Sequence, residues 1–577
     1  MTASAEGINA VARVTAAYHR IDEVDRPEVW ITLRPRDEVM AEAERVDAAP
    51  RGALSGRVLA IKDNIDVAGL PTTAACRAFA YQPGEDAAAV ARLRAAGAIV
   101  LGKTNLDQFA TGLVGTRSPY GAVHDATRPG FVSGGSSSGS AVAVALGIAD
   151  LGLGTDTAGS GRVPAAFQGI VGLKLTRGLI PTAGVVPACR TLDCVSLLVR
   201  DVASAHHAAW LMTGRDRHPT GAAGALDREW PPAAALAAPS APRVGVPSEG
   251  ELVELSADSR RAFAGAVARV SSLGAEIVPL DIEPLVQAGQ LLYAGAFVAE
   301  RDAAFGEFAR AHPHEMDPSV LRIINDAAEL PARQLVADAE ALDALRVAVR
   351  PTLESCDALL LPTVSRQPTI AEVQADPITV NAELGRYTNF VNLLDLCAYA
   401  VPAGRADGGH FGVSFVASAF SDRVIEDLAA RFLGEPTLPL IDSGPRGIPL
   451  LVIGAHRTGQ PLNHQLSETG GRLLGIAATA PGYRMYALDT DPPKPGLIRV
   501  DGDRDGTSIE GEVWDIPAAH LGPLLASLPR PMTLGRVTLS DGAEVVGFLC
   551  EPAGASGATD ISSFGSWLTY RRTLGRS

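Results

Sequence analysis

The sequence predicts an α/β protein, in which a sheet is covered by helices, followed by a smaller, mostly β domain of the α+β class. Three observations predict this fold class. From Arg57 onward, short apolar runs alternate with helical patterns, which is typical of a sheet with helices on both faces. Residues 434–449 hold four prolines and three glycines, which indicates a linker between domains. Strand-like runs separated by Gly and Asp turns resume after this linker.

In the first domain we expect a helix where apolar residues recur with the helical period, and a strand where they form a short run. A glycine, proline or polar residue marks the end of each element. Residues 1–50 favour helices, because alanines and valines are spaced among charged residues. A strand at 58–61 is followed by a helix at 87–96 that stops at a glycine and leads into a strand at 98–102. The remaining elements expected are a surface loop at 213–242, strands at 243–246, 275–278 and 358–362, and helices at 257–273, across 284–349 and at 387–400.

The second domain is expected to contain one or two helices among short strands. Its strands are predicted at 450–453, 473–477, 483–487, 511–514, 536–539 and 545–549. We therefore expect domains at 1–435 and 450–577, joined by a linker at 436–449.

Composition limits the classes of function. The chain has 577 residues, too many for one ordinary core, and 47% of them are hydrophobic. The net charge of −15 argues against nucleic acid or an anionic membrane as the main partner. A basic segment followed by an apolar one is missing at the N-terminus, and no apolar run is long enough to span a bilayer, so we expect a cytoplasmic location. The six cysteines are scattered, which predicts buried thiols without disulfides.

The run Gly134-Gly-Ser-Ser-Ser-Gly-Ser140, followed by Gly152-Leu-Gly-Thr-Asp-Thr-Ala-Gly-Ser160, is the strongest signal for chemistry. Glycines bring backbone N–H groups close to a ligand, and serines supply hydroxyls. A serine needs a base, and a buried, neutral Lys62 at a strand end would serve. Two alternatives remain open: Lys62 as a solvated surface charge, and the run as a phosphate loop, although the motif GxxxxGK[ST] is missing.

These residues resemble the amidase signature family. The matching segments are Lys62-Asp-Asn64, Gly102-Lys-Thr-Asn105, the Gly134–Ser140 run and Gly154-Thr-Asp-Thr-Ala-Gly-Ser160-Gly-Arg-Val-Pro164. The resemblance implies an α/β/α sandwich with a mixed sheet, on which Ser160 is the nucleophile and Lys62 the final base. Ser136 would bridge them and follow a cis peptide bond that does not involve proline.

The resemblance also implies an oxyanion hole and an amide substrate. The backbone N–H groups of Thr157, Ala158 and Gly159, with that of Ser160, would stabilise a tetrahedral intermediate. Arg162 could contact the substrate or could pair with Asp156, and both interpretations stay open.

Tyr293 and Arg301 suggest what kind of amide binds. They are eight residues apart, about two helical turns, so both are expected near one face of a helix. Arginine binds a carboxylate through two parallel hydrogen bonds. The alternative is a surface arginine beside a half-buried tyrosine.

The segments Gly454–Asn463, Ile509–Trp514, Gly547–Glu551 and Ile561–Trp567 resemble the C-terminal domain of the allophanate hydrolase family, whose fold is related to the γ-glutamylcyclotransferase-like fold. This resemblance implies that allophanate, a small ureido carboxylate, is converted to ammonia and carbon dioxide. The second domain would promote decarboxylation of an N-carboxycarbamate product. His456 is the residue expected to act there, with His464 as the rival, and Glu512 as a weaker candidate.

No metal or cofactor is expected, since the eleven histidines include no HExxH motif and no Cys/His cluster. The resemblance implies a homodimer. No biotin carboxylase segment is present, so we expect any urea carboxylase to be a separate protein. Two other interpretations are kept. The chain could be another amidase, such as the A-type component of a glutamyl-tRNA amidotransferase that feeds ammonia to a charged tRNA. It could also be a non-catalytic binding protein on an amidase scaffold.

Overall fold

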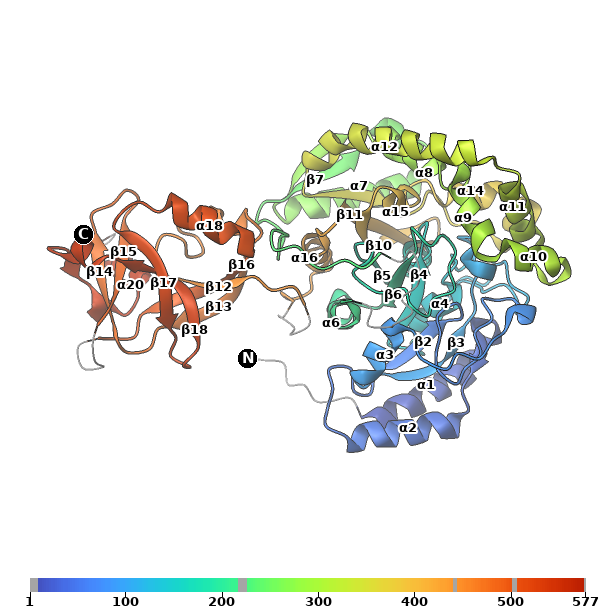
Figure 1. Cartoon of the computed structure of the whole chain (residues 1–577), viewed down its shortest axis with the longest axis horizontal. Coiled ribbons are helices and arrows are strands. Elements are labelled where there is room, and N and C mark those ends of the chain that lie inside the picture. Colours follow the sequence, from blue (N-terminus) through green and yellow to red (C-terminus); the bar gives the residue numbers. More distant parts are fainter. Residues whose placement is uncertain (1–8, 216–225, 439–443, 501–505, 575–577) are drawn as a thin grey trace. The chain divides into compact units, whose positions relative to one another are not determined.

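The computed structural model describes residues 9–215, 226–438, 444–500 and 506–574. The chain divides into two compact units (Figure 1). The N-terminal unit comprises residues 1–229 and 242–443, and the C-terminal unit comprises residues 230–241 and 444–577.

The N-terminal unit is built on one mixed sheet. Its strand order is β1-β3-β2-β4-β6-β5-β10-β11-β9-β7-β8. β2 runs parallel to β3 and β4, whereas β6 runs antiparallel to β4 and β5, so the sheet has parallel and antiparallel parts. The strands are β1 Trp30–Leu33, β2 Val58–Lys62, β3 Ile99–Thr104, β4 Leu151–Asp156, β5 Val171–Lys174, β6 Cys194–Val199, β7 Arg243–Pro247, β8 Glu276–Leu280, β9 Ala358–Pro362, β10 Leu396–Ala406 and β11 Gly409–Ser418.

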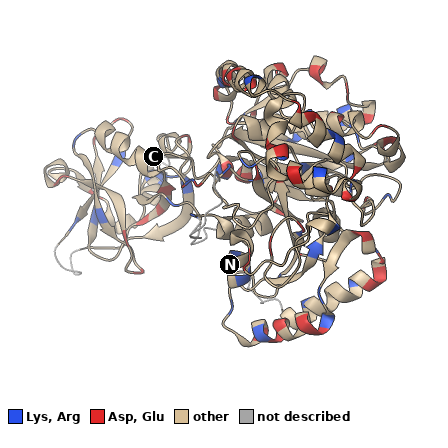
Figure 2. Cartoon of the chain, turned by 45° about the vertical axis from the view of Figure 1, so that its right-hand side comes forward, with Lys and Arg blue, Asp and Glu red and all other residues tan. Residues whose placement is uncertain are grey.

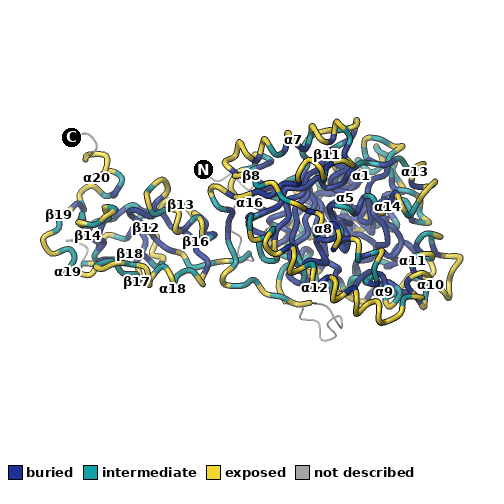
Figure 3. Tube along the Cα trace, turned by 90° about the horizontal axis from the view of Figure 1, so that it is seen from above, coloured by how far each residue is buried: buried dark blue, intermediate teal, exposed yellow. Residues whose placement is uncertain are grey.

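Helices surround this sheet, and most of its strands are buried, except β1 and β8, while α7, α10 and α12 carry many exposed residues (Figure 3). The helices are α1 Ala10–Val24, α2 Arg36–Ala48, α3 Ala88–Ala95, α4 Ser138–Ala145, α5 Arg162–Gln168, α6 Val202–Met212, α7 Ala257–Ser272, α8 Glu283–Gln290, α9 Ala299–Arg301, α10 Glu307–Ala311, α11 Pro318–Ala328, α12 Ala332–Glu354, α13 Ile370–Ala375, α14 Thr379–Glu383, α15 Phe390–Leu393 and α16 Asp422–Leu433. The short helices α4 and α5 are almost wholly buried, because small side chains let them pack tightly.

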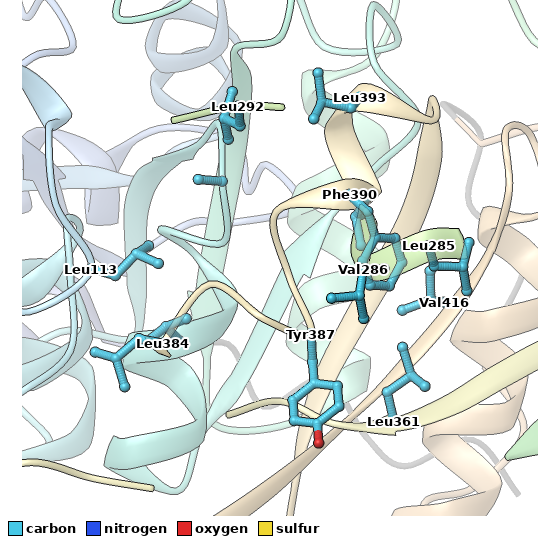
Figure 4. Close-up of a cluster of buried hydrophobic side chains, with 14 of the residues drawn as sticks. Leu113, Leu285, Val286, Leu292, Leu361, Leu384, Tyr387, Phe390, Leu393 and Val416 are labelled. Atoms are coloured by element: carbon cyan, nitrogen blue, oxygen red, sulfur yellow. The ribbon is translucent and has the colours of Figure 1, made fainter. Parts of the chain in front are cut away.

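A large apolar cluster lies beside the Gly/Ser loops. Leu113, Val286, Leu384, Tyr387 and Phe390 meet in it (Figure 4), and Tyr387 and Phe390 are fully buried. The cluster includes Ala158, which lies between two of the predicted oxyanion-hole residues. Burying an aromatic side chain of this size contributes about 2–3 kcal/mol, so the cluster holds the Ala158 loop against α8 and α15.

Most of the predicted strands of the first domain are confirmed, but one helix prediction is wrong. The segment expected to be helical at 387–400 contains only the short α15, and from Leu396 onward it is the strand β10. β10 pairs with β5 on one side and β11 on the other, so it is a central strand. A continuously apolar run of this kind carries no period that distinguishes a strand from a buried helix.

Residues 213–242 are only partly the surface loop that the composition predicts. Residues 216–225 of this stretch lie outside the described part of the chain. Residues 230–241 belong to the C-terminal unit, where Leu236 is 2% exposed and its N–H donates to Gly470 O at 2.8 Å. Residues 230–241 form no helix or strand, as predicted, but residues 236–238 are buried against a unit whose other residues are distant in sequence.

The C-terminal unit is rich in β structure. It has a five-stranded sheet of order β13-β16-β12-β18-β17 and a three-stranded sheet of order β15-β14-β19. The elements are β12 Ile448–Val452, α17 His464–Ser467, β13 Arg472–Ala478, β14 Tyr483–Leu488, β15 Lys494–Arg499, β16 Glu510–Ile516, α18 Ala518–Ser527, β17 Met532–Thr538, β18 Glu544–Cys550, α19 Pro552–Ala555, β19 Thr559–Asp560 and α20 Trp567–Leu574. β15 was not predicted, since its proline and glycine are typical of a turn, but an edge strand tolerates both.

The cysteines, the helices and the surface charges each relate to an expectation drawn from the composition. All six cysteines are buried free thiols, as predicted. Within the described ranges, no helix has the length and apolar character needed to cross a membrane. Acidic and basic residues are interspersed on both units in the view of Figure 2.

Candidate active site

The end of β2 places Lys62 beside the end of the neighbouring strand β4. Lys62 Nζ lies 2.8 Å from Ser136 Oγ and 2.7 Å from Thr155 Oγ1. Lys62 and Ser136 are fully buried, and Thr155 is 2% exposed. The lysine is therefore held by two hydroxyls rather than solvated, which excludes the alternative of a surface charge.

Burial lowers the pKa of Lys62 from 10.5 to about 7. The carboxylates of Asp107, Asp156 and Asp193 oppose this shift, and the Arg301 charge adds to it. Within the described residues, no carboxylate lies within ion-pair distance of Lys62 Nζ. A large fraction of this amine is thus neutral near pH 7 and able to accept a proton.

The Gly134–Ser140 run brings Ser136 to Lys62. The peptide bond between Gly135 and Ser136 is cis, as the resemblance implies. A side chain at Gly135 would lie 2.2 Å from Asp107 Oδ2, so only glycine fits there. The hydroxyls of Ser137 and Ser140 donate to backbone oxygens of β4, at 3.1 Å and 2.8 Å, and so hold the run against the sheet.

The second Gly/Ser loop follows β4 and carries Ser160, which is 2% exposed. Ser137 N donates to Ser160 O at 3.3 Å and joins the two loops. Among the described residues, the N–H groups of Thr157, Ala158, Gly159 and Ser160 donate to no protein acceptor. Such a row of unused donors beside a serine is what an oxyanion hole requires.

Gly159 shapes this loop. It has a φ of 134°, and a side chain there would lie 2.4 Å from Thr388 Oγ1. Among the hydrogen bonds of the described residues, none joins the hydroxyls of Ser136 and Ser160. The structure places both serines on adjoining loops, which the bond from Ser137 N to Ser160 O joins.

Arg162 is paired within the protein. Its Nε and Nη2 donate to the carboxylate of Asp156 at 2.9 Å and 2.8 Å, and its Nη1 donates to Thr388 O at 3.2 Å. Both Arg162 and Asp156 are fully buried. The geometry therefore agrees with the pairing to Asp156, and substrate contact by Arg162 stays a prediction without support from its hydrogen bonds.

Tyr293 and Arg301 lie together, but not on one helix as predicted, because Tyr293 is in the turn after α8 and Arg301 ends α9. Arg301 Nη2 donates to Tyr293 Oη at 2.8 Å, and Arg301 Nη1 donates to Thr111 Oγ1 at 3.1 Å. Arg301 is fully buried, which excludes the alternative of a surface arginine, and its Nε has no partner. Tyr293 lines a cavity of about 910 Å³, which is large enough for a ligand, and Arg301 does not itself line it but bonds the Tyr293 hydroxyl. Lys62, Ser136 and Ser160 do not line this cavity.

Two residues that position the site were missed from the sequence. Thr155 bonds Lys62, and Asp193 accepts a hydrogen bond from the Thr157 hydroxyl and from the backbone N–H of Ala188 at 2.8 Å. Thr155 belongs to the Gly154–Pro164 motif and lies at a strand end, so the sequence could have indicated it. No sequence motif indicates Asp193, because only the fold brings it to the loop that carries Ser160.

The C-terminal unit has its own cavity, of about 190 Å³, and His456 lines it. The imidazole stacks on Phe548 at 4.6 Å between ring centroids, and its Nε2 lies 2.9 Å from Gln465 Oε1. Burial lowers the pKa of His456, and the nearby Lys494 adds to this effect. The ring is therefore mostly neutral at pH 7.

The two other candidates in this unit lie outside that cavity lining. His464 is exposed, and its Nδ1 is 3.0 Å from Pro461 O. Glu512 accepts hydrogen bonds from the backbone N–H and hydroxyl of Thr458, at 2.8 Å and 3.0 Å, so it holds a loop.

A buried lysine, a serine after a cis bond and a serine beside unused N–H groups define the class of amidase-signature amidohydrolases. The chain belongs to this family: residues 12–425 match the amidase model, and residues 448–572 match the allophanate hydrolase C-terminal domain. The chain thus combines the two domains that characterise allophanate hydrolases.

Solved and curated relatives agree with this assignment. Allophanate hydrolase of Kluyveromyces lactis has a TM-score of 0.88 and 37% identity, over 98% of this chain and 97% of that one. The urea amidolyase of Saccharomyces cerevisiae is 39% identical over 94% of this chain. This chain spans about a third of that relative, since the match covers 31% of it. The A-type component of the glutamyl-tRNA(Gln) amidotransferase of Symbiobacterium thermophilum is 35% identical over 73% of this chain and 92% of its own length.

Proposed function

We propose that the chain hydrolyses allophanate to ammonia and carbon dioxide. The observation that carries the substrate is Arg301, a buried guanidinium without a carboxylate partner. Two other fully buried cations have one: Lys103 lies 2.9 Å from Asp63, and Arg162 lies 2.8 Å from Asp156. Among the described residues, Arg301 bonds only hydroxyl and carbonyl oxygens. An unpaired buried charge is costly, so an anionic group of the substrate is the natural partner.

Ser160, Ser136 and Lys62 are proposed to form the catalytic relay. Ser160 Oγ attacks the terminal amide carbonyl of allophanate, and its proton passes through Ser136 to neutral Lys62. The oxyanion is stabilised by the N–H groups of Thr157, Ala158 and Gly159. Lys62 then returns the proton to the leaving nitrogen, which departs as ammonia. Water attacks the acyl-enzyme by the same relay and releases N-carboxycarbamate.

The C-terminal unit is proposed to promote loss of carbon dioxide from N-carboxycarbamate at the cavity that His456 lines. We also propose, from the resemblance, that this unit shares the γ-glutamylcyclotransferase-like fold and that the chain forms a homodimer. A urea carboxylase would supply allophanate, and the urea amidolyase relatives support this coupling. The boundaries 435 and 450 between the two domains stay a proposal.

Removing the Arg301 charge tests the substrate class. For Arg301→Gln, kcat/KM for allophanate is expected to fall about 100-fold, because a charge-assisted bidentate pair is lost. Biuret carries a carboxamide in place of the carboxylate, so its kcat/KM should change less than about threefold. Arg301→Lys keeps the charge, so its kcat/KM for allophanate should lie between those of the wild type and Arg301→Gln. Equal losses of kcat/KM for allophanate and biuret would contradict binding of the carboxylate by Arg301.

A time course of ammonia and carbon dioxide from allophanate tests the division of labour. For His456→Ala, the first ammonia is expected to appear at the wild-type rate, whereas carbon dioxide release should lag behind it. His464→Ala is the matched control, because His464 is exposed and outside the cavity lining. Carbon dioxide that keeps pace with ammonia in His456→Ala would contradict the role of His456. Ammonia released only from glutamine would favour the amidotransferase interpretation.

A further inference from the structure

The cavity beside Tyr293 has a second buried guanidinium in its wall. Arg117 lines this cavity together with Tyr293 and Leu113, and it is 2% exposed. Its Nη1 donates to Thr111 O at 2.9 Å, and its Nη2 donates to Pro377 O. These two carbonyls fix the plane of the guanidinium against the loop that follows β3.

Several N–H groups of Arg117 have no acceptor among the described residues. An arginine has five N–H groups, and two of those of Arg117 have acceptors in the protein. Its Nε is buried without a partner. Other arginines at this cavity have carboxylate partners: Arg386 lies 3.3 Å from Glu254, and Arg366 lies 3.0 Å from Glu383.

Within the described residues, no carboxylate is within ion-pair distance of the Arg117 guanidinium. The acid in its own loop is Asp107, whose oxygens accept the backbone N–H groups of Val114, Gly115 and Arg117 at 3.0–3.2 Å. Burial raises the pKa of Asp107, and the Arg117 charge opposes that rise. The carboxylate of Asp107 thus accepts backbone N–H groups, and Arg117 lines the cavity without a carboxylate partner in the described part of the chain.

Thr111 connects the two unpaired arginines. Its hydroxyl accepts from Arg301 Nη1 at 3.1 Å, and its carbonyl accepts from Arg117 Nη1 at 2.9 Å. Two buried like charges that meet at one residue repel each other, and an anion between them relieves this repulsion.

We propose that Arg117 is a specificity-determining residue that binds the substrate carboxylate together with Arg301. The proposal rests on the proposed function, since it deepens the account of how a ureido carboxylate is chosen. The two guanidinium groups and the Tyr293 hydroxyl then form a carboxylate pocket at the wall of the cavity. Arg301 is fully buried and bonds the Tyr293 hydroxyl, and Tyr293 and Arg117 line the cavity.

Competition with two matched ligands tests this pocket. Malonamate and malonamide differ only in a carboxylate against a carboxamide, and both resemble allophanate with a methylene in place of the N–H. In Arg117→Gln, the Ki of malonamate against allophanate hydrolysis is expected to rise about 10- to 100-fold, while that of malonamide changes less than about threefold. KM for allophanate should rise with the malonamate Ki, and kcat should stay within about threefold.

Arg322→Gln is the matched control. Arg322 lines the same cavity but is 70% exposed in its side chain and lies 3.7 Å from Asp326, so both Ki values should stay at wild-type levels. If Arg117 only braces its loop, Arg117→Gln will lower kcat and leave the ratio of the two Ki values unchanged, which overturns the proposal.

Arg117→Lys covers the case in which the glutamine variant does not fold. Lysine keeps the charge but loses the planar fork, so malonamate affinity should still fall several-fold relative to malonamide. An unchanged ratio in Arg117→Lys also overturns the proposal. If the wild-type chain does not hydrolyse allophanate, the proposed function fails. In that case, the affinities of malonamate and malonamide are measured by calorimetry for the wild-type and Arg117→Lys chains. An unchanged ratio of the two affinities overturns the role of Arg117.

Discussion

Ser160→Ala is expected to lower kcat for ammonia release from allophanate by about 10⁴-fold or more, because no nucleophile remains to form the acyl-enzyme. Ser160 is 2% exposed, so alanine fills nearly the same space and the unused N–H groups around it are kept. The residual rate then reports the oxyanion hole and substrate binding alone. The measurement is single-turnover ammonia release by the full chain.

Ser138→Ala is the matched control for this loss. Ser138 lies in the same Gly/Ser run, is fully buried, and donates to Asn105 O at 3.3 Å, so it tests removal of a hydroxyl without removal of the nucleophile. Its kcat should stay within about tenfold of wild type, since one neutral hydrogen bond contributes about 1 kcal/mol. Turnover that survives Ser160→Ala would exclude Ser160 as the nucleophile.

Lys62→Met is expected to lower kcat by about 10³- to 10⁴-fold, because the amine that acts as general base is removed while an unbranched side chain one atom shorter remains. Methionine also removes the hydrogen bonds from Lys62 to Ser136 and Thr155, at 2.8 Å and 2.7 Å. The double variant with Ser160→Ala should be little worse than either single one, since the members of a relay act as a unit. Additive losses would contradict a shared relay.

The pH profile gives a second test of Lys62. The amine must be neutral to accept a proton, and burial sets its pKa at about 7. The wild-type kcat should therefore fall about tenfold for each pH unit below 7 and level off above it. For Lys62→Met, the residual kcat should lose this dependence. A wild-type profile that is flat from pH 5 to pH 8 would contradict Lys62 as the base.

The catalytic part of the site could be predicted because its residues are local motifs. Lys62 ends a strand, and Ser136 and Ser160 stand in Gly-rich loops that only glycine can build, as the close approach of Asp107 to Gly135 shows. Short-range sequence carries such constraints, and the resemblance assigned each position a role. The alternation of β2, β3 and β9 with helices was likewise a local pattern.

The prediction failed where burial is set by distant partners. β10 is an apolar run without period, and its pairing with β5 and β11 decides that it is a strand. Residues 230–241 have the composition of a loop, yet Leu236 is buried in a unit formed mainly by residues after 443. Asp193 and Thr388 reach the Ser160 loop from elsewhere in the chain, and no motif marks them.

By itself, the sequence determined the family and the presence of a second domain of the allophanate hydrolase type, and it predicted the relay residues. Only the tertiary structure decided which arginines are available to a substrate. Arg162 and Arg301 are both fully buried, but one meets Asp156 and the other meets only neutral oxygens. The physical reason is that the free energy of a buried charge depends on its neighbours in space, and those neighbours come from segments far apart in the chain.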